Sequence, residues 1–241
     1  MILILGGTAE ARALAAALHQ SGVAVVSSLA GRVANPRLPE GEVRIGGFGG
    51  PEKLASWLDD HAVTAVVDAT HPFAERISAS AAAACEQTQT PLLRLERPGW
   101  SERHGDRWRW VDSLEQAAQA IEHERVFLTT GRQGLAAFAH NDRAHFLIRC
   151  VDPPGPPLPP SHELILDRGP YNLDKELELL DRHRIELLIT KDSGGEHTVA
   201  KLDAARVRGT PVIVVRRPCR PASEAVATVE EAVAWAKAQP G

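Results

Sequence analysis

The chain opens with MILILGGTAEAR (residues 1–12), and this stretch decides the class of fold. Its aliphatic residues 2–5 predict a buried strand, and Gly6 and Gly7 allow the chain to turn sharply after that strand. The alanine-rich segment 10–20 then predicts a helix. A strand, a glycine turn and a helix in this order form the first unit of a parallel α/β sheet.

Short aliphatic runs alternate with helical segments along the rest of the chain. This alternation predicts βαβ units, and therefore parallel sheets with both faces covered by helices. The strands are expected at residues 2–5, 24–28, 43–45, 65–68, 92–95, 108–111, 126–129, 145–149, 163–166, 187–190 and 212–215. The helices are expected at 10–20, 51–60, 72–87, 114–123, 173–182 and 229–238.

Two segments of the chain resemble each other. TPLLRLERP (90–98) and TPVIVVRRP (210–218) share the pattern T-P-Φ-Φ-x-Φ-x-R-P at an offset of 210 − 90 = 120 residues, and each precedes a helix with a capping-box sequence. We therefore expect an α/β fold with two Rossmann-like parallel-sheet halves and a cleft between them, divided into domains 1–112 and 113–241. Segment 108–124 can pack on either half. The alternative is one large sheet with recurrent βα units.

Composition limits the classes of function. The chain has 241 residues and a net charge of −4, which does not favour nucleic-acid binding. Its three cysteines are scattered, so neither a disulfide framework nor a metal site is expected. No apolar run reaches the roughly 18 residues that span a membrane, and no signal peptide is visible, so we expect no membrane association and a cytoplasmic location.

The first glycine turn is a candidate phosphate site. Gly6 and Gly7 would let backbone N–H groups approach a pyrophosphate at the helix N-terminus, and Thr8 would add a hydroxyl donor. The second strand ends in SSLAGR, without the acid that NAD-binding proteins use to bind the ribose 2′-OH. Ser28 and Arg32 would instead bind a 2′-phosphate, so NADP is predicted rather than NAD. The alternative is that Arg32 is an ordinary loop arginine.

Two further loops follow predicted strands, at the sheet edge where doubly wound folds bind ligands. Gly47 lies in GGFGG, which indicates either close approach of the backbone to a ligand or a mobile loop. Asp68 and Thr70 follow the fourth strand and are expected to help bind the cofactor. Pro72 suits the first helical position, which would place His71 where it contacts the nicotinamide ribose or the substrate, and His71 is also a candidate catalytic residue. A structural role for His71 is the alternative.

Five motifs run along nearly the whole chain: GGTAEAR (6–12), DATHPFA (68–74), LRLERPGW (93–100), TTGR (129–132), and TKDSGG followed by KLDAA (190–205). Together they resemble the precorrin-6A reductase family of cobalamin biosynthesis. The resemblance implies NADPH-dependent hydride transfer to a double bond of precorrin-6A, giving precorrin-6B. The substrate would be precorrin-6A or its cobalt form, and neighbouring enzymes of the pathway are possible partners.

The implied chemistry assigns roles in the second half of the chain. Hydride addition to a conjugated ring also needs a proton, and the candidate acids are Lys201 and, second, Lys191. The alternative is that both lysines only bind substrate carboxylates, and that Tyr171 packs in the core rather than stacking on a ring. The candidate substrate-binding residues are Arg132, Tyr171, Ser193, Gly194 and Arg216.

Two other functions are compatible with the sequence. One is a different NADP-dependent reductase, because Tyr171 and Lys175 match the pattern Y-x-x-x-K, although they lie in the second half, away from the first glycine turn. The other is a nucleotide-sensing module without catalytic activity. A sensor would explain the glycine turns but not the lysine- and glycine-containing loop at 191–201.

Overall fold

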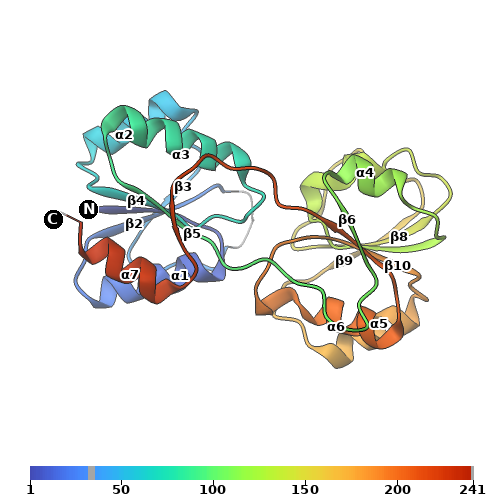
Figure 1. The fold of residues 1–241 in the computed structure, drawn as a ribbon. Helices are drawn as coiled ribbons and strands as arrows, with labels where there is room; N and C mark the ends of the chain where they lie inside the picture. Colours follow the sequence, from blue (N-terminus) through green and yellow to red (C-terminus); the bar gives the residue numbers. More distant parts are fainter. Residues whose placement is uncertain (32–35, 240–241) are drawn as a thin grey trace. The chain divides into compact units, whose positions relative to one another are not determined.

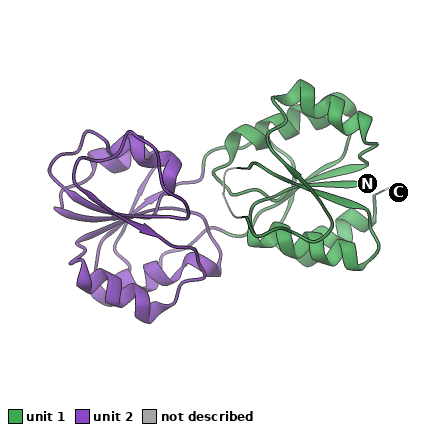
Figure 2. Cartoon of the chain, turned by 180° about the vertical axis from the view of Figure 1, so that it is seen from behind, with its two compact units in different colours: residues 1–98, 218–241 green, residues 99–217 purple. Residues whose placement is uncertain are grey.

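The computed structural model describes residues 1–31 and 36–239. The chain divides into two compact units (Figure 2): unit 1 comprises Met1–Pro98 and Pro218–Gly241, and unit 2 comprises Gly99–Arg217. Each unit contains one six-stranded parallel sheet with helices on both faces (Figure 1). The predicted α/β class with two Rossmann-like halves is confirmed. No described helix is long and apolar enough to cross a membrane.

Unit 1 has the strand order β12-β5-β4-β1-β2-β3, with every pair parallel. Helices α1 and α7 cover one face of this sheet, and α2 and α3 cover the other (Figure 1). The elements are β1 (Ile2–Leu5), α1 (Ala9–Gln20), β2 (Val25–Leu29), β3 (Glu42–Ile45), α2 (Pro51–Asp60), β4 (Ala65–Asp68), α3 (Glu75–Thr88), β5 (Leu92–Leu95), β12 (Glu224–Val226) and α7 (Val229–Lys237).

Unit 2 has the strand order β6-β11-β10-β7-β8-β9, again with every pair parallel. Helices α5 and α6 pack together on one face, and α4 packs with the 3-10 helix η1 on the other (Figure 1). The elements are β6 (Trp108–Val111), α4 (Leu114–Gln119), β7 (Arg125–Leu128), η1 (Arg132–Phe138), β8 (His145–Cys150), β9 (His162–Leu166), α5 (Leu173–Arg182), β10 (Leu187–Lys191), η2 (Glu196–Thr198), α6 (Ala200–Arg208) and β11 (Val212–Val215).

The first strand explains why continuous apolar runs mark the centre of each sheet. Ile2 and Ile4 belong to the hydrophobic cluster that includes α1 and α7, whereas Leu3 and Leu5 belong to the cluster that includes α2. Successive side chains of a strand point to opposite faces, so a strand covered on both faces needs apolar residues at every position. Each such buried side chain stabilises the fold by roughly 1.5–3 kcal/mol.

The two units exchange their last strand and helix. Five strands of each half follow the same order, and β5 corresponds to β11, as the repeated T-P segments predict. However, β6 follows β5 in the chain but pairs with β11 of unit 2, where Trp108 lies opposite Val212. Reciprocally, β12 follows β11 but pairs with β5 of unit 1, where Glu224 lies opposite Leu93. Helix α7 then packs on α1.

This exchange corrects the predicted domain boundaries of 1–112 and 113–241. Segment 108–124 belongs to unit 2, and the chain after residue 217 returns to unit 1. The local sequence predicts β6 as a strand but does not predict β12, and each of the two pairs with a strand far from it in sequence. Because β5 and β11 offer equivalent edges, the sequence alone does not distinguish the two pairings.

Candidate cofactor site and candidate catalytic site

The turn after β1 forms a backbone cradle at the N-terminus of α1. The Gly6 N–H donates to the Ser28 carbonyl at 3.0 Å, which fixes the turn against β2. A Cβ on Gly6 would lie 3.4 Å from the Leu29 side chain, and Gly7 has a φ of +116°, which side chains rarely allow. The first N–H groups of a helix have no partner within the helix and carry partial positive charge. This cradle therefore fits a pyrophosphate.

The Thr8 hydroxyl has a different role from the predicted one. It accepts from the Ala11 N–H at 3.1 Å as the N-cap of α1, and it donates to the Ala69 carbonyl at 2.8 Å. Its one hydrogen is therefore used inside the protein, where it joins the turn after β1 to the turn after β4. The prediction that Thr8 donates to a phosphate is corrected, because its partner Ala69 is 61 residues away and left no local signal.

An ion pair compensates the one acid in the first turn of α1. Arg97 Nη1 lies 2.6 Å from Glu10 Oε2, and both side chains are largely buried. A free carboxylate at this position would repel a phosphate bound at the helix N-terminus. The Arg97 partner reduces that repulsion. No sequence pattern connects these two residues, which are 87 positions apart.

Arg44 of β3 holds the glycine loop that contains Gly47. The Arg44 guanidinium donates to the carbonyls of Gly46 at 2.5 Å and Gly47 at 3.0 Å, and it lies 3.9 Å from the centre of the Phe48 ring. These contacts hold the loop in one conformation. Of the two interpretations of GGFGG, they favour close approach of the backbone to a ligand over a mobile loop. A Cβ on Gly47 would meet nothing within 4 Å, so the backbone there faces open space.

The predicted contacts to a 2′-phosphate lie at the end of β2. Ser28 is buried there and is the register partner of Arg44, a residue that the sequence analysis did not single out. Arg32 lies outside the described residues. Residues 27–31 contain no carboxylate. The phosphate-binding roles of Ser28 and Arg32 remain predictions.

Asp68 and Thr70 form a buried polar network with two residues that the sequence did not indicate. The Asp68 carboxylate accepts from the hydroxyls of Thr70 and Ser78, both at 2.6 Å. Arg220 donates to Asp68 at 3.2 Å, to Thr70 at 3.0 Å and also to Ser78. These side chains thus hold the turn after β4 in place. Whether Asp68 and Thr70 also contact the cofactor stays a prediction.

His71 lies in a turn rather than at the start of a helix. Its Nδ1 accepts from the Phe73 N–H at 3.3 Å, and its carbonyl accepts from the Ala74 N–H at 2.8 Å. Residues 71–74 form this turn, so helix α3 begins at Glu75, later than the predicted start at Pro72. His71 is half-buried. Its contact with ribose or substrate stays a prediction.

In unit 2, Lys201 lies in the first turn of α6 and is only 4% exposed. Its Nζ lies 5.2 Å from the centre of the Trp100 ring and has no hydrogen-bond acceptor among the described residues. Burial and, secondarily, the positive charge of Arg149 lower the pKa of Lys201 from 10.5 to about 7, while Glu176 opposes them. Such a group releases its proton near neutral pH.

Arg149 and Glu176 form a buried ion pair beside this lysine. Two parallel hydrogen bonds join them, Nη1 to Oε1 at 2.5 Å and Nη2 to Oε2 at 3.1 Å. The Arg149 guanidinium also lies 3.7 Å from the centre of the Tyr171 ring. Sequence reasoning missed Glu176, although its spacing from Leu179 and Leu180 places it on the apolar stripe of α5, where an acid needs a partner.

Tyr171 therefore has one face covered by Arg149, and its hydroxyl donates to the Asp167 carbonyl at 3.2 Å. It precedes Asn172, the N-cap of α5, whereas Lys175 is exposed on that helix. The two residues of the Y-x-x-x-K match are thus not on one helix. Whether Tyr171 also touches a substrate stays a prediction.

Strand β10 ends at Lys191, one residue later than predicted, and the loop after it carries Ser193 and Gly194. The Ser193 N–H donates to the Lys191 carbonyl at 2.7 Å, and the Ser193 hydroxyl lies 3.4 Å from that of Thr198. Gly194 has a φ of +63°, which favours glycine. This folded loop leads directly into α6. The roles of Lys191, Ser193 and Gly194 in catalysis and substrate binding stay predictions.

The two arginines predicted to bind substrate carboxylates differ in surroundings. Arg132 opens η1 after Gly131, which has a φ of +76°. Arg216 follows β11; its Nε lies 3.3 Å from Asp112 Oδ1, and both side chains are more than half exposed. Exposed pairs of this kind contribute at most about 1 kcal/mol, so Arg216 can exchange this partner for another carboxylate at little cost.

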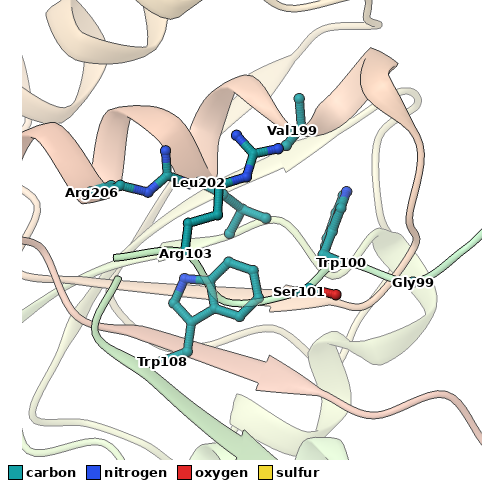
Figure 3. Close-up of a pocket in the computed structure, with 8 residues that line it drawn as sticks. All are labelled: Gly99, Trp100, Ser101, Arg103, Trp108, Val199, Leu202 and Arg206. Atoms are coloured by element: carbon teal, nitrogen blue, oxygen red, sulfur yellow. The ribbon is translucent and has the colours of Figure 1, made fainter. Parts of the chain in front are cut away.

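An open pocket of about 250 Å³ lies in unit 2, beside Trp100 (Figure 3). The Trp100 and Trp108 rings and the aliphatic side chains of α6 form its apolar walls. The Trp108 Nε1–H is buried and has no acceptor among the described residues. Trp100 thus borders both the pocket and Lys201. The lining residues are Gly99, Trp100, Ser101, Arg103, Trp108, Val199, Leu202 and Arg206.

Comparison with known proteins identifies the family. A family model described as precorrin-6x reductase CbiJ/CobK matches residues 1–237. The chain belongs to this family. A precorrin-6A reductase of Rhodococcus erythropolis is 53% identical over 97% of this chain and 96% of its own length. One from Mycobacterium tuberculosis (strain CDC 1551 / Oshkosh) is 52% identical over 99% and 98%.

The solved structure of CobK precorrin-6A reductase is also similar, with a TM-score of 0.93 and 43% identity; the match covers 98% of this chain and 95% of that one. The similarity thus extends through both units and the exchanged strands. The resemblance drawn from the five motifs is confirmed, and with it the prediction of a reductase of cobalamin biosynthesis.

Proposed function

We propose that the protein reduces a double bond of precorrin-6A, with NADPH as the hydride donor, to give precorrin-6B. Membership of the precorrin-6x reductase family supports the reaction class. The names of two relatives at more than half identity support precorrin-6A as the substrate. The structural observation that carries the proposal is Lys201, a buried lysine without a hydrogen-bonded partner among the described residues.

Unit 1 would hold the cofactor, which supplies the hydride when bound. The pyrophosphate fits the cradle of Gly6 and Gly7 at the N-terminus of α1. The end of β2 has no carboxylate that would repel a 2′-phosphate, and it lies beside Arg44. These features favour NADPH over NADH.

Lys201 would supply the proton that completes the reduction. Hydride addition to a conjugated ring leaves an electron pair on the ring, and a proton must reach a neighbouring ring atom. A lysine with a pKa of about 7 is protonated in about half of the molecules at neutral pH and gives up its proton easily. Its ammonium would also stabilise the negative charge that develops before the proton moves. Lys191, Arg132 and Arg216 would bind carboxylates of the macrocycle.

The test is oxidation of NADPH by the purified protein with enzymatically generated precorrin-6A. We expect oxidation only when the macrocycle is present, and much slower oxidation with NADH. Lys201→Met should lower the rate by about 100-fold or more without changing NADPH binding. Lys175→Met, at an exposed lysine of the same unit, is the matched control and should leave the rate unchanged. Binding of NADPH without its consumption, with either metal-free or cobalt-containing substrate, would reject the proposal.

A further inference from the structure

The chain passes between the two units twice, at residues 98–99 and 217–218. In unit 2, Asp192 binds the residues next to both of these positions, Trp100 and Arg217. The Trp100 N–H donates to Asp192 Oδ1 at 2.9 Å. Arg217 Nε lies 3.2 Å from Asp192 Oδ2 and donates to the Asp192 carbonyl oxygen at 3.1 Å. A single carboxylate thus serves both connections.

The position of Asp192 is itself well determined. It follows the last residue of β10, and its N–H donates to the Val215 carbonyl at 2.9 Å, which continues the pairing of β10 with β11. The residue is only 7% exposed. Its carboxylate is therefore fixed by the sheet on one side and held between the two connections on the other.

The first connection is fitted closely to this carboxylate and to the loop that follows it. The Trp100 indole Nε1 donates to the Gly195 carbonyl at 3.1 Å, so both polar hydrogens of Trp100 bind the loop after β10. A Cβ on Gly99 would lie 2.6 Å from Asp192 Oδ2, closer than non-bonded atoms approach. Glycine at this position is thus required for the carboxylate to keep its place.

We infer that Asp192 is a positioning residue that fastens both chain connections between the units to the loop that follows Lys191 and leads to Lys201. The inference rests on the proposed function, because the loop matters to catalysis only if those lysines take part. Asp192 acts through Trp100, whose ring lies 5.2 Å from Lys201 Nζ. Without the carboxylate, the Trp100 N–H loses the oxygen that accepts its hydrogen bond, and the Arg217 Nε loses the negative charge 3.2 Å away.

The test compares Asp192→Asn with the wild-type protein by hydrogen exchange and by steady-state kinetics. The variant keeps the shape of the side chain, removes its charge and replaces one of the two oxygens by an NH2 group, so that a donor faces either the Trp100 N–H or the Arg217 Nε. We expect faster exchange in the peptide that contains Trp100 and in residues 193–198. We also expect kcat/KM for precorrin-6A to fall about tenfold or more, since small displacements of catalytic groups have large effects on rate. NADPH binding should not change.

Asp106→Asn is the matched control. Asp106 is a carboxylate of the same unit with a side chain only 1% exposed, and it pairs with Arg206 at 2.9 Å without touching the loop after β10. This variant should lose stability but keep both kcat/KM and the slow exchange of residues 193–198. An equal loss of activity in the two variants would overturn the inference, because general destabilisation would then explain both.

Gly99→Ala provides a second variant in case Asp192→Asn does not fold. The added methyl group must displace the Asp192 carboxylate, so the same exchange and kinetic effects are expected. Gly155→Ala adds a methyl group with nothing within 4 Å and is the control. If the wild-type protein does not oxidise NADPH, the proposed function fails. If exchange around Trp100 is unchanged in Asp192→Asn and Gly99→Ala, the inference itself fails, whatever the activity.

Discussion

Replacing Lys201 by methionine should remove a pH dependence from the stability of the protein. Burial and the neighbouring Arg149 lower the pKa of Lys201 from 10.5 to about 7 in the folded state. At about 1.36 kcal/mol per pH unit, this difference corresponds to a cost on the order of 5 kcal/mol for burying the charged form. Methionine fills a similar volume and carries no charge.

The sign of the effect follows from proton binding. Between pH 7 and 10.5 the unfolded chain keeps the Lys201 proton while the folded protein releases it, so stability rises with pH in this window. Below pH 7 both states are protonated and the full cost of the buried charge is present. From pH 7 to pH 9, the free energy of unfolding of the wild-type protein should therefore rise by about 2–3 kcal/mol relative to Lys201→Met.

The assay is urea unfolding at pH 6, 7, 8 and 9 for the wild-type protein, Lys201→Met and Lys175→Met. The Lys175 variant controls for titration elsewhere, because this lysine is exposed, and its difference from the wild-type protein should be constant across the series. A constant difference between wild type and Lys201→Met as well would refute the reasoning. It would mean that the ammonium is either solvated or paired in the folded state.

Three further predictions concern other described residues. Arg220→Met should lower the free energy of unfolding by about 3–5 kcal/mol, measured in urea, because it leaves Asp68 charged and unpaired in the interior; a loss below about 1 kcal/mol would contradict this role. Gly7→Ala should weaken NADPH binding, measured by isothermal titration, since a side chain at a φ of +116° adds strain of about 1–3 kcal/mol; equal affinity would show that the turn does not bind the cofactor. Glu176→Gln should move the pH profile of NADPH oxidation to lower pH. The carboxylate of Glu176 raises the pKa of Lys201 in the wild-type protein, so its removal lowers that pKa; a shift to higher pH would contradict the arrangement.

Local sequence patterns predict the fold where every residue of a strand is buried, because each position must then be apolar. The strands 2–5, 65–68, 92–95, 108–111 and 212–215 have the predicted bounds, and most of them are buried runs with little freedom in their composition. Strand β12 was not predicted, because its three residues, EAV, are partly exposed and form no apolar run. The exchange of β6 and β12 was also beyond reach, because local sequence specifies a strand but not which of two equivalent edges it joins.

In the candidate site, too, features with a local sequence signal could be predicted, whereas contacts between residues far apart in sequence could not. Gly6, Gly7 and Lys201 could be singled out from the sequence because a glycine turn after a strand, or a position after a glycine loop, leaves a local signal; their roles stay predictions. Asp68 and Thr70 were assigned to the cofactor because they end a strand. Their contact with Arg220, which is about 150 residues away, could not be predicted, because no spacing rule connects these residues.

The most direct test of the account is to follow the hydrogen that is transferred. The protein would be supplied with precorrin-6A and NADPH carrying deuterium at the transferred position of the nicotinamide, and the macrocycle would be analysed by mass spectrometry. The account predicts a product that has gained one deuterium from the cofactor and one hydrogen from the solvent. A macrocycle that is reduced without cofactor deuterium, or that is recovered unchanged while NADPH is bound, would contradict direct hydride transfer by this protein.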